Sequence, residues 1–403
     1  MGTVSSAAPK TRQDQGLRSS AADCPPIFSP RVRPESPTRF VLAASRRTQA
    51  LTLRLVILAL LATSCSRDAA RTGYVFEGAT MGTTYTVKVV TQIPLGASSS
   101  PKQEQVQQVI EDRLAEIDEK MSTYRPSSEL SRFNTSRATA PFSVSAETLQ
   151  VFAEAQRISA ATGGAFDITV GPLVNLWGFG PNAKPLTVPA DEEVERLRAQ
   201  IGWSRIEVDT ALSTIRKSEP EMYCDLSAIA KGYAVDRVAE GLSALGLADY
   251  MVEVGGEVRT QGRNAAGEPW RIAIERPDTA QRAFQEVVPL SDLSMATSGD
   301  YRNFYEQGGV RFSHTIDPRT GRPIQHRLAS VSVIDPACMR ADGYATALMV
   351  LGEERGFELA TEQDLAALFL VRSGAGFEEK ATPAFKTLFP GLRLGRVNRA
   401  VEQ

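Results

Sequence analysis

Histidine and cysteine are scarce in this chain of 403 residues, which has two histidines and four cysteines. The histidines are His314 and His326, and the cysteines are Cys24, Cys65, Cys224 and Cys338. They form no CxxC pair and no Cys/His cluster, which a zinc site or a Cys–His nucleophile would need. The sequence therefore argues against both kinds of site.

The N-terminal part of the chain lacks an apolar run long enough to cross a bilayer. The run from Leu55 to Ala62 has eight residues, whereas a membrane-spanning helix needs roughly 20. Basic residues precede this run, and small residues follow it up to Cys65. This order is typical of a secretory signal, so we interpret residues 46–64 as a signal segment.

Cys65 resembles the lipidated cysteine of bacterial lipoproteins, which becomes the mature N-terminus. We therefore expect residues 65–73 to be a lipid-anchored tether that holds an exported protein on the periplasmic face of a bacterial membrane. The alternative is an exported protein in which this cysteine occurs by chance. Residues 1–45 are rich in Pro, Ser, Arg and Ala, which predicts a disordered extension, unless the true start lies downstream of Met1.

The chain has no excess of positive charge once the signal is removed. Residues 1–64 hold nine basic and three acidic residues, which leaves 36 basic and 44 acidic residues in residues 65–403, a net charge of −8. A nucleic-acid binder needs a basic face to neutralise phosphates, so we expect no nucleic-acid partner.

Apolar periodicity predicts an α+β fold. Helices are predicted near residues 103–121, 145–162, 194–201, 225–245, 342–351 and 353–361. Strands are predicted near residues 84–90, 205–209, 212–217, 250–254, 271–275, 285–290, 330–334 and 366–371. Many strands are linked as hairpins, which favours mixed or largely antiparallel sheets flanked by helices over a doubly wound parallel sheet. We expect a single large domain of two lobes over residues 74–390, followed by a tail, 391–403.

Four segments are richer in Gly, Asp, Ser and Thr than a core needs. Residues 78–83 are either a plain β-turn or a turn that lets backbone approach a ligand. Residues 163–178 are either a helix C-cap with aromatic core residues or a site where Phe166 and Trp177 pack against a flat ring. In residues 225–233, a helix that starts at Ser227 would place Lys231 one turn later on the same face, a suitable seat for phosphate; the alternative is a capped helix with a solvated lysine.

The fourth segment combines residues 298–302, 314–321 and 341–346. Asp342 and Thr346 are four residues apart, so one helix face can present a carboxylate and a hydroxyl, hard oxygen ligands that suit Mg²⁺. The alternative is an N-cap aspartate and a core-facing threonine. His314 is a candidate proton acceptor, although a lone histidine is more often structural.

The order and spacing of these segments resemble the ApbE family, the bacterial FAD:protein FMN transferases. The resemblance covers roughly residues 74–390 and rests on eight motifs. They are GATMGT at 78–83, MSTYRPSSELSRFN at 121–134, GGAFDITVGPLVNLWGFG at 163–180, DLSAIAKGYAVD at 225–236, VEVGGEV at 252–258, SGDYRNFYEQGG at 298–309, HTIDPRTGRPI at 314–324 and ADGYATALMVLG at 341–352.

The resemblance implies a set of site residues. It implies flavin contacts at Met81, Tyr124 and the turn Ala165, Phe166 and Asp167, and FAD contacts at Asp225, Lys231 and Ile316. It implies Mg²⁺ at the carbonyl of Ala228, the carboxylate of Asp342 and the hydroxyl of Thr346. It implies His314, or a nearby aspartate such as Asp225, as the catalytic base. Ala345 and Lys231 stand where some members of the family carry an acidic residue.

The implied reaction is phosphoryl transfer with FAD as substrate and Mg²⁺ as cofactor. A threonine hydroxyl of an exported domain of a respiratory redox flavoprotein attacks the phosphorus on the flavin side, and AMP leaves. Two alternatives remain open: a periplasmic FAD pyrophosphatase, in which water replaces threonine, and a non-catalytic flavin-binding protein. The Asp342/Thr346 pair favours chemistry, since a passive binder needs no metal at the pyrophosphate.

The proximity of Cys224 to Asp225 and of Cys338 to Asp342 leaves two possibilities for these thiols. Export would permit a disulfide between them. Two separate buried thiols are the alternative.

Overall fold

The computed structural model describes residues 71–180, 187–277, 284–301, 303–374 and 376–394. The predicted disordered extension, the signal segment, Cys65 and the end of the tail lie outside these residues. The described residues belong to one compact unit. No helix within these ranges is both long enough and apolar enough to span a membrane.

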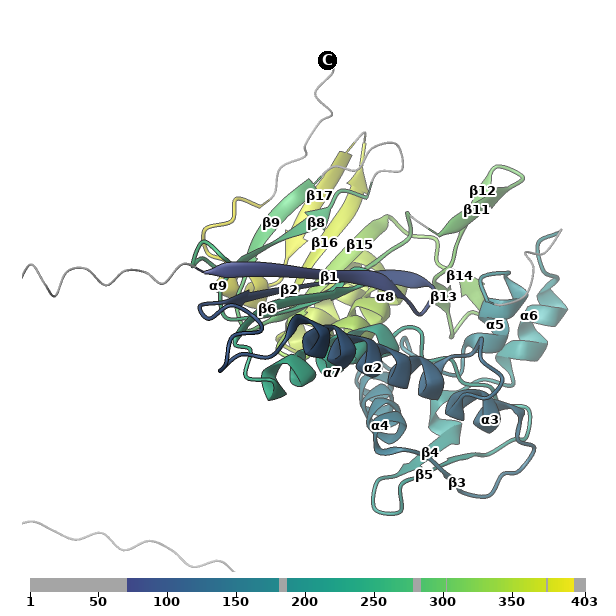
Figure 1. Cartoon of the computed structure of the whole chain (residues 1–403). Coiled ribbons are helices and arrows are strands. Elements are labelled where there is room, and N and C mark those ends of the chain that lie inside the picture. The colour runs from purple at the N-terminus through teal and green to yellow at the C-terminus, as the bar shows by residue number, and fades with distance from the viewer. Residues whose placement is uncertain (1–70, 181–186, 278–283, 302, 375, 395–403) are drawn as a thin grey trace, which may run out of the picture. The chain divides into compact units, whose positions relative to one another are not determined.

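An eight-stranded sheet forms the centre of the unit, and each neighbouring pair of its strands is antiparallel (Figure 1). In spatial order the strands are β1 (Thr72–Thr80), β2 (Thr83–Thr91), β6 (Asp249–Val254), β7 (Glu257–Gln261), β10 (Ser294–Gly299), β15 (Leu328–Asp335), β16 (Ala366–Ser373) and β17 (Gly376–Ala381). The smaller sheets contain β3 (Phe142–Ser143), β4 (Ile206–Asp209), β5 (Thr214–Lys217), β8 (Trp270–Glu275), β9 (Phe284–Leu290), β11 (Phe304–Gln307), β12 (Val310–Ser313), β13 (Ile316–Asp317) and β14 (Arg322–Pro323). The prediction of an α+β fold with largely antiparallel sheets is confirmed.

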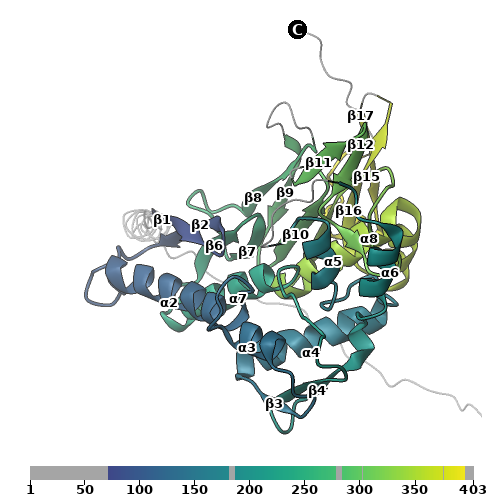
Figure 2. The ribbon, with the colours of Figure 1, turned by 90° about the vertical axis from the view of Figure 1, so that its right-hand side faces the viewer.

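Helices lie between these strands along the chain. They are α2 (Gln103–Met121), α3 (Glu129–Thr135), α4 (Ala146–Ala161), α5 (Gly171–Leu176), α6 (Asp191–Arg198), α7 (Ala230–Ala244), α8 (Cys338–Glu362) and α9 (Pro383–Leu388), with a 3₁₀ turn at Trp203–Arg205. Figures 1 and 2 show α2, α4 and α7 on one side of the large sheet and the β8–β9 hairpin on the other.

Alternation along β16 explains why both faces of this sheet are covered. Phe369 and Val371 pack in the core that contains the buried faces of α7 and α8. Leu368 and Leu370 point the other way, into a second core with residues of β8, β9 and α9. Successive side chains of a strand point to opposite faces, so a continuous apolar run requires a layer on each side.

Two helix boundaries differ from the prediction. The helix predicted from residue 225 begins at Ala230, because the Asp225 carboxylate accepts the N–H of Ser227 at 2.9 Å and Ile229 has a non-helical φ of −149°. Ser227 is therefore in a turn before α7 and does not start the helix. The first of the two helices predicted around residues 342–361 begins earlier, at Cys338; the predicted break between them is confirmed, because α8 consists of two helical segments joined at a kink at Gly352, whose φ is 80°.

A buried lysine and an asparagine fix the segment that leads to Asp225. Lys217 on β5 is 0% exposed, and its Nζ donates to two carbonyls at the end of α3 and to that of Met222, at 3.1–3.2 Å. The side chain of Asn134 exchanges two hydrogen bonds of 2.8 Å with the backbone of Cys224. These bonds hold the chain against α3 and fix the backbone of Cys224, the residue directly before Asp225.

Candidate active site

The twelve site residues that the motif resemblance implied all line one cavity of about 1050 Å³. They are Met81, Tyr124, Ala165, Phe166, Asp167, Asp225, Ala228, Lys231, His314, Ile316, Asp342 and Thr346. They come from the β1–β2 turn, the segment after α2, the turn after α4, the start of α7, strand β13 with the residues before it, and α8. The cavity is of the size of small-molecule and cofactor sites.

Met81 and Gly82 form a two-residue turn between paired Thr80 and Thr83. Both have positive φ, 46° and 72°, as the hairpin turns that match strand twist require. Glycine adopts this conformation without cost, whereas Met81 is held in it with its side chain against the cavity. Residues 81–82 thus form a β-turn that also lines the cavity, so the two interpretations of this segment do not exclude each other.

The turn after α4 is built around a buried carboxylate. Asp167 accepts hydrogen bonds from the N–H and hydroxyl of Thr169, at 2.7 and 2.6 Å, and from the N–H of Trp203 at 2.9 Å. Burial raises the pKa of Asp167, and these bonds oppose the rise. Its carboxylate therefore fixes the shape of the turn that carries Ala165 and Phe166 to the cavity wall.

Trp177 does not line the cavity with Phe166. Its indole N–H donates to the carbonyl of Gly321 at 2.9 Å, and its ring stacks on Phe312 at 5.5 Å between centroids. The suggestion that Trp177 packs against a bound ring is wrong, because the indole is held in the core between α5 and the residues after β13.

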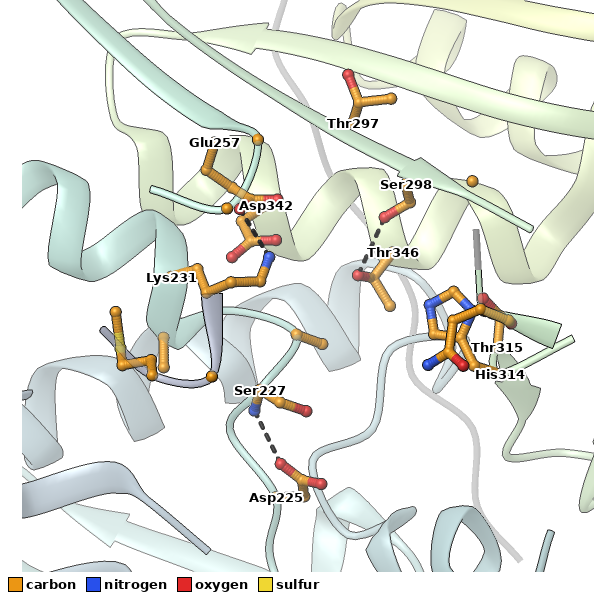
Figure 3. A pocket seen from close by; sticks show the side chains of 18 of the residues that line it. Asp225, Ser227, Lys231, Glu257, Thr297, Ser298, His314, Thr315, Asp342 and Thr346 are labelled. Carbon is orange, nitrogen blue, oxygen red and sulfur yellow. Dashed lines mark hydrogen bonds and ion pairs between the residues drawn. The ribbon is translucent and has the colours of Figure 1, made fainter. Parts of the chain in front are cut away.

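Lys231 and the buried carboxylates of Asp342 and Glu257 form a charged cluster (Figure 3). The Nζ of Lys231 lies 2.7 Å from Oε2 of Glu257. The carboxylate of Asp342 accepts the N–H of Gly232 at 2.9 Å. Lys231 is therefore an ion-pair partner in the first turn of α7 and lines the cavity, so it is not a freely solvated lysine. Its role as a seat for phosphate stays a prediction.

The carboxylates of this cluster outnumber its ammonium group. Burial, opposed by Lys231 and reinforced by Asp342, raises the pKa of Glu257 to about 7. Burial also raises the pKa of Asp342, against the effects of Lys231 and of the Gly232 N–H. Two buried carboxylates facing one ammonium leave negative charge that a bound cation would compensate.

The donor set of this region fits Mg²⁺. Asp342 and Thr346 lie on one face of α8, and both line the cavity with Ala228, in the turn before α7. The Thr346 hydroxyl lies 3.4 Å from that of Ser298 on β10, a contact drawn as a dashed line in Figure 3. Within the described residues no group of three or more His, Cys, Asp or Glu side chains could hold a metal, so a site here would combine a carboxylate with neutral oxygens, as Mg²⁺ accepts.

His314 is held in one tautomer. Its Nδ1 lies 3.0 Å from the carbonyl oxygen of Asn303, and a carbonyl only accepts, so Nδ1 carries the proton and Nε2 keeps its lone pair. Burial and, secondarily, Lys231 lower the pKa of His314, whereas the Asn303 carbonyl and Asp300 raise it. The net result is a neutral ring with a basic nitrogen at neutral pH.

The remaining predicted residues differ in exposure. Tyr124 is 68% exposed, whereas Ile316 is only 4% exposed and also packs in a small core. Asp225 is half-buried, and one of its oxygens is already engaged by the Ser227 N–H. Ala345 is 0% exposed within the main core, so an acidic residue there would need a different local packing.

Glu257 is a charged residue of the cavity wall to which the sequence reasoning assigned no role. It follows Gly255 and Gly256 in the VEVGGEV motif, which was recognised without assigning any of its residues a role. The available signal was a carboxylate directly after a two-glycine turn, whose φ values are 61° and 106°. Its partner Lys231 is far away in sequence, so the pair itself could not be read from spacing.

Cys224 and Cys338 are both free, buried thiols. The backbone of Cys224 is bound to Asn134, and the Sγ of Cys338 lies 3.6 Å from the carbonyl of Val258 on β7. The structure therefore has the two separate thiols and not the disulfide.

Comparison with known proteins gives a consistent result. A sequence model described as the ApbE family matches residues 81–369. The chain is 50% identical over 334 residues to the FAD:protein FMN transferase of Vibrio cholerae, covering 82% of this chain and 97% of the relative. It is 46% identical over 316 residues to the Haemophilus influenzae protein of the same name, covering 77% and 90%.

Solved structures are also similar to the chain. The flavin transferase ApbE from Vibrio cholerae has a TM-score of 0.72 and 49% identity, covering 79% of this chain and 99% of that one. The Pseudomonas stutzeri flavinyl transferase ApbE in its apo form has a TM-score of 0.72 and 41% identity, covering 80% and 98%. The match in sequence and in fold extends over nearly the whole of these proteins, and the chain therefore belongs to the ApbE family.

Proposed function

We propose that this flavin transferase splits FAD in a Mg²⁺-dependent reaction and attaches the FMN half to a threonine of another protein. The threonine oxygen forms a bond to the phosphorus on the flavin side, the bond from that phosphorus to the bridging oxygen breaks, and AMP leaves with that oxygen. The observation that carries the proposal is the cavity in which Asp342, Thr346, Lys231 and His314 converge. The names of its relatives support the same chemistry.

Each side chain has a role in this proposal. Mg²⁺ held by Asp342, Thr346 and the Ala228 carbonyl would withdraw charge from the pyrophosphate oxygens. Lys231, fixed by Glu257, adds a second positive charge next to the metal ligands. His314 accepts the hydroxyl proton at Nε2, and Asp225 is the alternative acceptor.

A transfer assay separates this proposal from its alternatives. The mature protein is incubated with a candidate exported acceptor domain, FAD and MgCl₂, and both proteins are examined by intact mass spectrometry. We expect the acceptor to gain FMN through a phosphoester and AMP to appear in equal amount. Free FMN and AMP with an unmodified acceptor would indicate a pyrophosphatase, and intact FAD would indicate a passive flavin carrier.

The proposal extends to localisation through Cys65. The small-residue cleavage site before Cys65 supports lipidation, which would hold the enzyme at the periplasmic face of the membrane, near exported domains of respiratory redox flavoproteins. We expect Cys65→Ser to move the protein from the membrane fraction to the soluble fraction. Fractionation and N-terminal mass analysis test this, and a membrane-bound Cys65→Ser protein that keeps residues 1–64 would contradict it.

A further inference from the structure

Two buried carboxylates link α7 and α8, and each helix contributes one of them. Asp342 on α8 accepts the N–H of Gly232, the third residue of α7, at 2.9 Å. Asp236 on α7 accepts the N–H groups of Cys338 and Met339, the first two residues of α8, at 3.0 and 2.9 Å. Each helix thus supplies the carboxylate that receives the free N–H groups at the start of the other.

Neither helix has a side-chain cap of its own. The N-cap residues are Ile229 for α7 and Ala337 for α8, and no side-chain hydrogen bond from either is present. The first N–H groups of a helix have no partner within the helix, and buried ones need another acceptor. Asp236, 6% exposed, and Asp342, 4% exposed, take this role, and their charge suits the positive end of each helix dipole.

The contact between the helix starts leaves no room for a side chain. A Cβ added at Gly232 would lie 2.8 Å from the Cβ of Asp342 and would also collide with the carbonyl of Cys338. The two helices therefore meet backbone to backbone at the point where Asp342 turns towards the cavity. A small rotation of α8 would move the Asp342 carboxylate directly, and a rotation of α7 would move its partner, the N–H of Gly232.

Asp236 also reaches the strand that carries Glu257. Nη1 of Arg259 on β7 donates to Oδ1 of Asp236 at 2.6 Å, and Arg259 is two residues after Glu257. Asp236 therefore bonds to α8 and β7 from its own helix, α7. These three elements carry Asp342, Glu257 and Lys231 respectively, so one carboxylate connects all three members of the charged cluster.

We propose that Asp236 is a positioning residue that fixes the orientation of Asp342, and of the Lys231–Glu257 pair, for binding the divalent cation. Asp236 is not among the described residues that line the cavity, so it acts through the backbone of α8 and through Arg259. The inference rests on the proposed function for the identity of the cation. Losing the partner that orients a metal ligand costs about 10- to 100-fold in metal affinity or activity.

The test variant is Asp236→Asn, which keeps the shape of the side chain but loses its charge and one of its two acceptor oxygens. We expect the Mg²⁺ concentration for half-maximal flavin transfer to rise at least ~10-fold, with FAD affinity in the absence of Mg²⁺ within about twofold of wild type. Binding of Mn²⁺ alone, followed by electron paramagnetic resonance, should weaken by the same factor without any turnover.

A matched control is Thr382→Ala, which removes the buried N-cap of α9 on the other side of the sheet. We expect this variant to lose stability, typically about 1 kcal/mol for a cap, without changing the Mg²⁺ requirement. An Asp236→Asn protein that loses stability but binds Mn²⁺ like wild type would overturn the proposal.

Arg259→Gln removes only the bond from Asp236 to β7 and provides the same comparison if Asp236→Asn does not fold. Wild-type Mn²⁺ affinity in the Arg259→Gln protein would also contradict the proposal.

Failure of the proposed function would give a different result. In that case wild-type protein would show no Mg²⁺-dependent transfer to any acceptor, so the activity titration would have no signal, whereas Mn²⁺ binding would still compare the variants. Amide hydrogen exchange in the metal-free protein still tests the connection. We expect Asp236→Asn to speed exchange at Cys338 and Met339, whose N–H groups donate to Asp236. Exchange should also be faster at Gly232, whose N–H donates to Asp342. Unchanged exchange at Gly232 would show that Asp236 does not orient Asp342.

Discussion

Asp342→Ala should lower the rate of flavin transfer at least ~10²-fold, the loss expected when one charged contact to a transition state is removed. Asp342 is the only charged ligand of the proposed Mg²⁺ set. FAD binding should weaken much less, because the cavity wall formed by Met81, Tyr124 and Phe166 is unchanged. The measurements are transfer rates across a Mg²⁺ titration and FAD affinity by fluorescence quenching.

Two further variants make this prediction sharper. Asp342→Asn keeps an acceptor for the Gly232 N–H, so its fold should be preserved while metal-dependent activity is lost. Thr346→Ala should have the same effect more mildly, because a neutral hydroxyl contributes less than a carboxylate. Full transfer by Asp342→Ala at ordinary Mg²⁺ would refute the metal site and remove the main reason to prefer an enzyme over a flavin carrier.

His314→Gln should reduce transfer by about 10²- to 10⁴-fold, the range for loss of a general base, with little change in FAD affinity. Glutamine can keep a bond to the Asn303 carbonyl but offers no basic nitrogen at the position of Nε2. His326→Gln is the matched control, since the other histidine does not line the cavity and bonds to the carbonyl of Met349.

The pH profile should identify the titrating group. Burial and Lys231 lower the pKa of His314, and the Asn303 carbonyl and Asp300 only partly offset this. The basic form is present above that pKa, so the acid limb that belongs to His314 should be centred below the ordinary histidine value, about 6.5, and apart from any limb near the pKa of Glu257, about 7. A limb below about 6.5 that persists unchanged in His314→Gln would exclude His314 as the base.

The long periodic elements were predictable because their patterns are local. Helix α2 begins and ends where the spacing of Val106, Ile110, Leu114 and Ile117 predicts. Strand β16 was recognised from its apolar run, but β17 and α9 were not, since their burial depends on packing against β16 and the β8–β9 hairpin. The start of α7 was placed too early because Asp225 and Ser227 form a turn, a local hydrogen bond that competes with helix capping.

The sequence alone determined the family, the α+β class and twelve of the residues that line the cavity, because the order and spacing of motifs can be recognised without knowing any contact. Only the tertiary structure brought Glu257 to Lys231, placed Trp177 in the core, and connected Asp236 to the start of α8. These contacts join residues that are distant in the chain, and their energies depend on burial and on the approach of helix ends. A one-dimensional pattern carries neither quantity, which is why motif residues of the cavity wall could be predicted and the contacts that orient them could not.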